Sequence, residues 1–269
     1  MGGNFRAPWW HSLITMGLGV LFAYIAYFNG PPTGFNAWEG VGSLLFWYSV
    51  VYLVLRFPFR GAFNVFLKYI GSRMGILASS LYVAFHLLLY GFILEVIFVH
   101  LYAPSFGGVP AAVWVNTNLV LPPTPLNTLL GLSYNPSITL SVPPIFGAVL
   151  SLYSFSSALI IAVLVVVNVG LVREVGSCPL GLKSRVYVGL PALGIVLGAS
   201  CCLSPPILLA LAAPATAVIT YSLPAYYVTY FTFPPLAMLA LYLNARSTAK
   251  IHRRLTRNAP AQQTALGTE

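Results

Sequence analysis

The chain contains two adjacent cysteines, Cys201 and Cys202, in an apolar stretch that also carries the double proline Pro205-Pro206. Two neighbouring thiolates can bind one soft metal ion, such as Cu(I) or Zn(II), whereas hard cations prefer oxygen ligands. Proline lacks a backbone N–H, so a helix would open one turn beyond the sulfurs and leave room for a ligand. The alternative is that both cysteines are small buried hydrophobic residues.

The residues around this pair resemble part of a known family. The stretch Gly198-Ala-Ser-Cys-Cys-Leu-Ser-Pro205 is similar to the vicinal-cysteine helix of the bacterial mercuric-ion transport proteins. The resemblance implies that Cys201 and Cys202 accept a soft metal ion from the outer side of a membrane. It also implies that Cys178, in a loop on the inner side, receives the ion next. The similarity is confined to this short segment.

A second set of candidate residues lies in one apolar segment, Met74 to Tyr102. Residues at steps of three and four predict a single, mostly polar helix face that points into a helix bundle. The face comprises Ser79, Tyr82, His86, Tyr90, Ile93, Ile97 and His100. The spacing of His86 and His100 is similar to that on the haem-bearing helices of the cytochrome b family, which implies a haem site. The alternative is that each histidine is hydrogen-bonded to a neighbouring helix.

Glu95 lies on the opposite face of the same predicted helix. The connections that we place on the outer side contain no Lys or Arg to pair with it. If it is buried, the carboxyl group could take up a proton or a cation during transport. If it reaches the outer interface, it needs no such role. Glu95 is therefore a candidate proton or cation relay.

The composition indicates that all these residues are held by membrane helices. Hydrophobic residues make up 58% of the 269 residues and charged residues only 6%, against about 25% charged residues in soluble domains. A stretch of about 20 apolar residues crosses a bilayer. Six segments are apolar enough to be considered: Ser12 to Phe28, Trp38 to Leu55, Met74 to Tyr102, Ile145 to Val172, Val186 to Leu211 and Tyr226 to Leu243. We expect an all-α fold with six transmembrane helices.

The placement of positive charge predicts the topology. All 13 Lys and Arg residues lie at the two ends of the chain or in every second connection. The other connections, 29–37, 103–144 and 212–225, contain none. Because Lys and Arg remain on the cytoplasmic side, both termini should be cytoplasmic in a multi-pass protein of the cell membrane. Residues 1–244 form the predicted membrane domain, and 245–269 form a basic tail with a disordered end.

Two of the connections have a predicted structure of their own. Arg56 to Arg73 alternates aromatic and basic residues and predicts an amphipathic segment on the inner leaflet. The outer loop, 103–144, is uncharged. Its stretches Val113 to Leu121 and Ile138 to Val142 are rich in β-branched residues and predict a small hairpin or lid. Such a lid can serve function directly, or it can be a docking face for another membrane subunit.

These features favour a permease-like or soft-metal-handling protein that uses the cysteine pair. Pro234-Pro235 should interrupt the last span, and broken helices often line transporter sites. The alternative is a non-catalytic subunit of a respiratory or redox complex, near haem or quinone. Enzymatic activity is not expected, since the chain has no Asp, phosphate-binding loop or His/Glu zinc motif. We expect lipid, and no nucleic acid, as a partner; a soft metal ion or haem remains the candidate cofactor.

Overall fold

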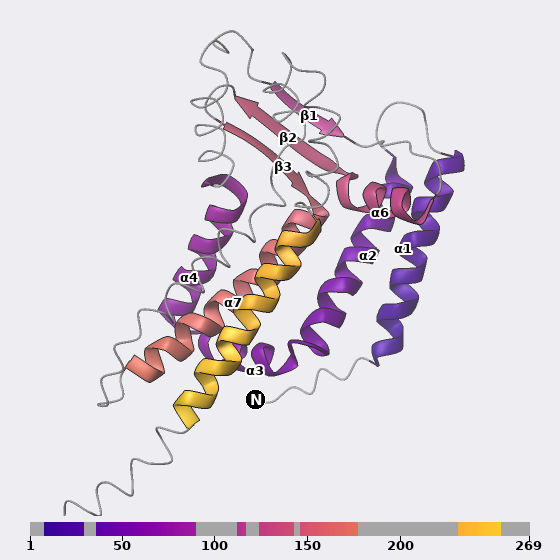
Figure 1. The fold of residues 1–269 in the computed structure, drawn as a ribbon. Coiled ribbons are helices and arrows are strands. Elements are labelled where there is room, and N and C mark those ends of the chain that lie inside the picture. The colour runs from indigo at the N-terminus through magenta and orange to yellow at the C-terminus, as the bar shows by residue number, and fades with distance from the viewer. Residues whose placement is uncertain are drawn as a thin grey trace, which may run out of the picture.

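A computed structural model of the chain describes residues 8–29, 36–89, 112–116, 124–142, 146–176 and 231–253. The described part is mainly helical, with a small sheet at one end (Figure 1). Three helices are long and apolar enough to cross a membrane: α1 (Trp9–Asn29), α2 (Ala37–Arg56) and α7 (Leu152–Gly176). A further helix covers residues 231–253.

The helices α1 and α2 form a closely packed hairpin. A Cβ on Gly19 would lie 2.7 Å from the backbone oxygen of Gly42, and a Cβ on Gly42 would lie 2.7 Å from that of Gly19. The two backbones therefore touch where neither residue has a side chain, as is common in membrane helix pairs. Lower in the pair, the hydroxyl oxygens of Thr15 and Ser49 are 2.5 Å apart and share a hydrogen bond.

The chain then turns through two short helices at the end of the bundle opposite the sheet. The amphipathic helix α3 (Arg60–Tyr69) is followed by α4 (Arg73–Ala84), and the α4 backbone continues as the π-helical turn η1 (Phe85–Leu89). Ser72 caps α4, because its hydroxyl accepts a hydrogen bond from the Gly75 N–H at 3.1 Å. The cap fixes where the chain leaves α3 and re-enters the bundle.

A three-stranded antiparallel sheet covers the other end. Its strands β1 (Ala112–Asn116), β2 (Ser137–Val142) and β3 (Phe146–Ser151) lie in that order, with Val113 opposite Leu140. The short helix α6 (Pro125–Tyr134) packs against α1 and α2 beside the sheet (Figure 1). β3 leads directly into α7, so the sheet is attached to the longest helix.

The junction between β3 and α7 is stabilised by reciprocal capping. The Ser151 hydroxyl accepts from the Ser154 N–H at 3.2 Å, and the Ser154 hydroxyl accepts from the Ser151 N–H at 2.9 Å. This arrangement satisfies backbone donors that the first turn of a helix otherwise leaves unpaired. The chain therefore changes from strand to helix at Ser151, and the N–H groups of Ser151 and Ser154 are both hydrogen-bonded.

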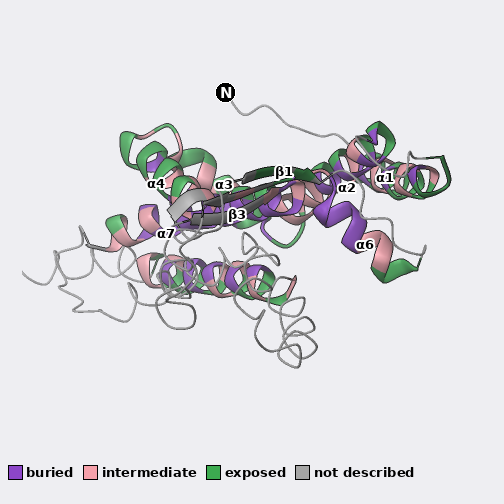
Figure 2. Ribbon diagram, turned by 90° about the horizontal axis from the view of Figure 1, so that it is seen from above, coloured by how far each residue is buried: buried purple, intermediate pink, exposed green. Residues whose placement is uncertain are grey.

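Helix α7 is the centre of the molecule. Most of it is buried, whereas α1 is mostly exposed (Figure 2). It contacts α2, α3, α4 and α6. The main hydrophobic core contains residues of α7 and of residues 231–253, among them Ile161, Leu164 and Leu241, which are fully buried. The exposed apolar faces of α1 and α2 are those that a bilayer would cover.

A polar network inside this core joins α7 to helix 231–253. The Asn168 amide donates to the backbone oxygens of Leu164 and Leu241, at 2.7 and 3.0 Å, and its oxygen accepts from the Asn244 amide at 2.7 Å. Thr248 donates in turn to the Asn244 backbone oxygen at 2.9 Å. Asn168 is only 2% exposed, so its amide group is hydrogen-bonded to the protein instead of to water.

Several predicted elements are confirmed. α1 and α2 match the first two predicted spans closely, and α3 lies within the predicted amphipathic segment. β1 does pair with β2, but α6 lies between them in the chain, so the two strands do not form the predicted hairpin. Tyr82 and His86 of the predicted polar face are buried, at 3% and 0% exposure. These are the elements whose periodicity is strongest in the sequence.

Two predictions are wrong in detail. The fourth predicted span, Ile145 to Val172, begins too early, because Phe146–Ser151 is the strand β3 and the helix starts only at Leu152. The double proline Pro234-Pro235 does not break its helix, since residues 231–253 are helical throughout. The fifth predicted span, 186–211, lies outside the described residues, as do 90–102 of the third and 226–230 of the sixth.

The basic residues of the described ranges gather at one end. They lie at the end of α2, in α3, at the start of α4 and at the ends of α7 and helix 231–253. All these segments meet at the end opposite the sheet (Figure 1). β1, β2, β3 and α6, at the other end, contain no Lys or Arg.

The Asn168 network yields a first prediction. Replacement of Asn168 by Ala should lower the free energy of unfolding by about 1–3 kcal/mol, because the buried Asn244 amide and the Leu241 carbonyl lose their partner. Chemical unfolding of the purified protein in mild detergent would measure this change. The control Asn64→Ala, at an exposed position on α3, should stay within about 0.5 kcal/mol of the parent. Equal effects at both positions would contradict a structural role for the network.

Candidate functional site

Of the candidate metal, cofactor and relay residues proposed from the sequence, only His86 lies within the described ranges. Cys178, Cys201, Cys202, Glu95 and His100 lie outside them. In the part of the chain that the structure describes, no group of three or more His, Cys, Asp or Glu side chains is arranged to hold a metal ion. The metal-handling and haem hypotheses therefore stay predictions.

His86 lies in η1, at the level where α4 approaches α7 and β3. Its side chain is fully buried, and Nδ1 is 2.8 Å from the Tyr82 hydroxyl. The other histidines of the described ranges, His11 and His252, lie near helix ends opposite the sheet. They do not face His86 across the core, so the described residues contain no bis-histidine pair of the kind that binds haem between helices.

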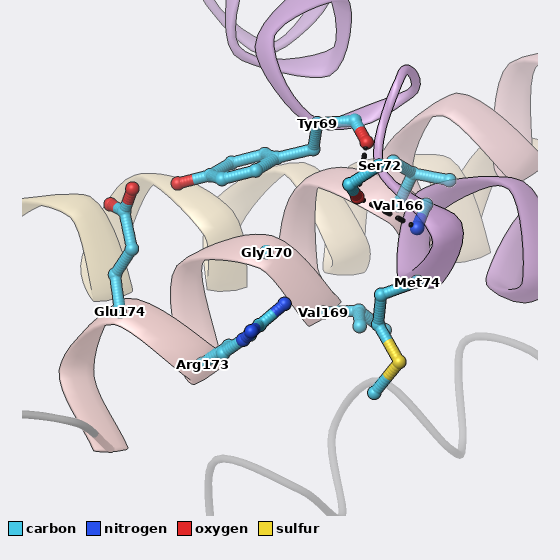
Figure 3. A pocket seen from close by; sticks show the side chains of 9 residues that line it. Tyr69, Ser72, Met74, Val166, Val169, Gly170, Arg173 and Glu174 are labelled. Atoms are coloured by element: carbon cyan, nitrogen blue, oxygen red, sulfur yellow. Dashed lines mark hydrogen bonds between the residues drawn. The ribbon is translucent and has the colours of Figure 1, made fainter.

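The described residues form a cavity at the basic end of the bundle. It has a volume of about 230 Å³ and lies between the start of α4 and the last turns of α7. Polar groups and apolar side chains both line it (Figure 3). The lining consists of Tyr69, Ser72, Met74, Gly75, Val166, Val169, Gly170, Arg173 and Glu174.

Charged groups surround one side of this cavity. The Glu174 carboxylate is 2.6 Å from the Lys68 ammonium and 3.5 Å from Nε2 of His252. Figure 3 shows the Tyr69 hydroxyl facing the same carboxylate. The carboxylate thus joins α3, α7 and helix 231–253. Because Lys68 is exposed, its ion pair contributes little stability by itself.

Tyr69 has an unusual electrostatic environment. Burial and the adjacent Glu174 carboxylate both raise the pKa of Tyr69 well above its ordinary value. Both effects disfavour the phenolate, since it would lose hydration and face a negative charge. Tyr69 therefore stays protonated at neutral pH and serves as a hydrogen-bond donor at the cavity wall.

Two glycines allow Tyr69 to take this position. A Cβ on Gly170 would lie 2.4 Å from the Tyr69 ring, and a Cβ on Gly75 would lie 2.2 Å from the Tyr69 backbone oxygen. The ring consequently lies flat against the α7 backbone, and its hydroxyl reaches Glu174 one turn further along. Any side chain at either glycine would displace Tyr69.

The arrangement is suited to binding a small polar molecule at the membrane interface. The cavity lining combines the Tyr69 phenol, the Arg173 guanidinium and the Glu174 carboxylate with apolar side chains. The Ser72 hydroxyl already donates to the Tyr69 backbone oxygen at 2.7 Å. The sequence interpretation missed it, because Tyr69 and Glu174 are more than a hundred positions apart. One signal was present: Glu174 is one of only four acidic residues in the chain, and it follows directly after Arg173 at the end of a long apolar segment.

Comparisons of the chain with known protein families, with curated proteins and with solved structures gave no match. The fold and composition define the class: a protein whose described residues are mostly helical and include three helices suited to crossing a membrane. Evidence on the function of this protein therefore comes from its own residues.

The close approach at Gly170 gives a second prediction. Gly170→Ala should lower the melting temperature in detergent by several degrees, because the new methyl group overlaps the Tyr69 ring and overpacking costs about 1–3 kcal/mol. Gly61→Ala is the matched control, since a Cβ there meets nothing within 4 Å and alanine favours a helix. The prediction fails if Gly170→Ala melts at or above the temperature of Gly61→Ala.

Proposed function

We propose that the chain is a permease-like protein of the cell membrane that handles a soft metal ion or another small solute. We further propose six membrane spans with both termini in the cytoplasm. The three apolar helices support the membrane assignment. The gathering of the described basic residues at the end opposite the sheet supports the orientation, since that end would be the cytoplasmic one.

The observation that carries this proposal is the cavity at the basic end. A solute that crosses the bundle needs a site at an aqueous face, and the space between α4 and α7 provides one of about 230 Å³. Its lining also includes the thioether of Met74, a ligand that suits soft metal ions better than hard ones. In this proposal Cys201 and Cys202 accept the ion in the outer half of the membrane, and Cys178 receives it on the inner side.

A second candidate function is supported by the exposed face of the sheet. Val113 and Val115 of β1 are 66% and 62% exposed, and Ile138, opposite Val115, is 43% exposed. An apolar surface of this kind at the end of a membrane protein favours contact with another subunit. This observation supports the alternative of a non-catalytic subunit in a respiratory or redox complex, with buried His86 near haem or quinone.

Metal binding tests the leading proposal. The purified protein, reduced and loaded with Cu(I) or Zn(II), should retain an equimolar amount of metal, measured by elemental analysis after desalting. Cys201→Ser together with Cys202→Ser should reduce the bound metal to background, because the hydroxyl is a poor ligand for soft ions. Cys178→Ser is the control and should retain the metal on the pair. Equal metal content in the parent and the double variant would exclude the cysteine site.

The same purified protein separates the two candidate functions. A stable particle larger than the chain and its detergent, or a Soret band in the visible spectrum, would favour the redox subunit. A particle without other subunits that binds metal through the cysteine pair would favour the carrier.

Labelling of single cysteines tests the proposed orientation. In a variant without native cysteines, Val113→Cys should react with a membrane-impermeant maleimide in intact cells, because the proposed orientation has β1 on the outer side. Gly61→Cys, equally exposed on α3, should react only after permeabilisation. The opposite pattern would overturn the orientation, and reaction of both in intact cells would place the two positions on one side.

A further inference from the structure

A buried carboxylate lies at the other end of the molecule, beneath the sheet and α6. Glu39 is in the first turn of α2 and is 8% exposed. Asn36 caps this helix: its side-chain oxygen accepts from the N–H groups of Trp38 and Glu39 at 3.1 and 3.4 Å. The Asn36 amide donates to the Ala26 backbone oxygen at 3.2 Å, so the cap is itself fixed to α1. The start of α2 is therefore rigid.

Residues at the end of α6 close around this carboxylate. The Asn135 amide donates to Oε1 of Glu39 at 2.8 Å, and the Ser43 hydroxyl donates to the Asn135 backbone oxygen at 2.5 Å. A Cβ on Gly131 would lie 3.2 Å from Oε1, so the carboxylate rests against the α6 backbone. Trp47 adds a hydrogen bond to the Leu132 backbone oxygen at 2.7 Å. Glu39 is thus held between two helices by fixed neighbours.

The charge of Glu39 is not matched by these neighbours. Within the described ranges, the salt bridges involve Glu174 alone. The predicted outer connections 29–37 and 103–144 contain no Lys or Arg. One amide donor does not compensate for burial of a full negative charge. The carboxyl group must therefore either take up a proton or lie beside a cation that the described side chains do not supply.

A second oxygen at the site also lacks a partner. Asn135 is 1% exposed, and its Oδ1 accepts no hydrogen bond. Rotation of the amide would not help while Glu39 is ionised, because Oδ1 would then face the carboxylate oxygen. Ser137, two residues along the chain, likewise has a buried hydroxyl oxygen without a partner. Buried acceptors of this kind need a donor or a cation.

The two acceptors of Asn135 and Glu39 are close enough to share one ion. The oxygen and nitrogen of an amide group are about 2.3 Å apart, from the bond lengths of the amide. Oδ1 of Asn135 therefore lies within about 5 Å of Oε1 of Glu39, given the 2.8 Å hydrogen bond. Hard cations bind oxygens at about 2.3–2.6 Å. A single ion could contact both oxygens only from beside the Asn135 amide, because its hydrogen-bonded N–H group occupies the space between them.

We propose that Glu39 and Asn135 form a binding site for a hydrated sodium ion at the end of the bundle that carries the sheet. The ligands are one carboxylate and neutral oxygens, so the site balances a single positive charge. A calcium ion would need several carboxylates and more oxygens than these residues offer. Bound sodium would neutralise Glu39 and satisfy the Asn135 oxygen, and it would fix α6 to α2. The site does not depend on the cysteine pair or on the cavity.

Thermal unfolding tests this proposal on the full-length protein in mild detergent at pH 7. Sodium chloride should raise the melting temperature progressively, relative to choline chloride at equal ionic strength, because a ligand that binds only the folded state stabilises it. Glu39→Gln should abolish the difference between the two salts. Gly131→Ala should weaken it, since the added methyl group crowds the carboxylate. Glu174→Gln is the matched control and should keep the full response.

Two results would overturn the proposal. The first is an identical melting temperature of the parent protein in sodium and choline, which would leave an ordered water as the partner of these oxygens. The second is an undiminished sodium response in Glu39→Gln. If neither Glu39→Gln nor Gly131→Ala folds, the line width of the sodium-23 resonance decides the question. The folded parent protein must broaden this resonance more than the heat-denatured protein does.

Discussion

The Asn168–Asn244 pair is the interaction on which the bundle depends. Most of helix α7 is buried, and its core neighbours are almost entirely apolar. In such an environment a polar group is tolerated only when its hydrogen bonds are complete. Asn168 meets this condition by bonding to the helix at 231–253, both through Leu241 and through Asn244. The pair thus fixes the register of two helices that hydrophobic packing alone would allow to slide.

The sequence predicts those parts of the fold that depend on local periodicity. The predicted bounds of α1 and α2 lie within three residues of the observed ones. Long apolar runs next to Asn, Gly and Pro predict a membrane helix and its ends. The inward direction of Tyr82 and His86 followed from helical spacing in the same way. The apolar run from Ile145 was misassigned, since a buried strand and the start of a buried helix have the same composition.

The candidate sites could not be predicted, because they depend on contacts between distant segments. The Tyr69 ring is positioned by the absence of a side chain at Gly170. Glu39 is paired with Asn135, 96 positions away, through an amide in a turn that no motif marks. The rarity of acidic residues singles out Glu39 and Glu174 as unusual. It does not reveal that one is matched by Lys68 and the other lacks a cationic neighbour among the described residues.

The distance along the chain between Glu39 and Asn135 has a consequence for biosynthesis. α1 and α2 contact each other throughout their length, so this hairpin can enter the bilayer as a unit while the ribosome is still making the rest. Asn135 is then not yet translated, so the Glu39 carboxylate is made without the amide that later receives it. Closure of α6 over α2 is therefore a late event in assembly. In a nascent chain that ends before α6, Glu39 would lack its hydrogen-bond partner Asn135.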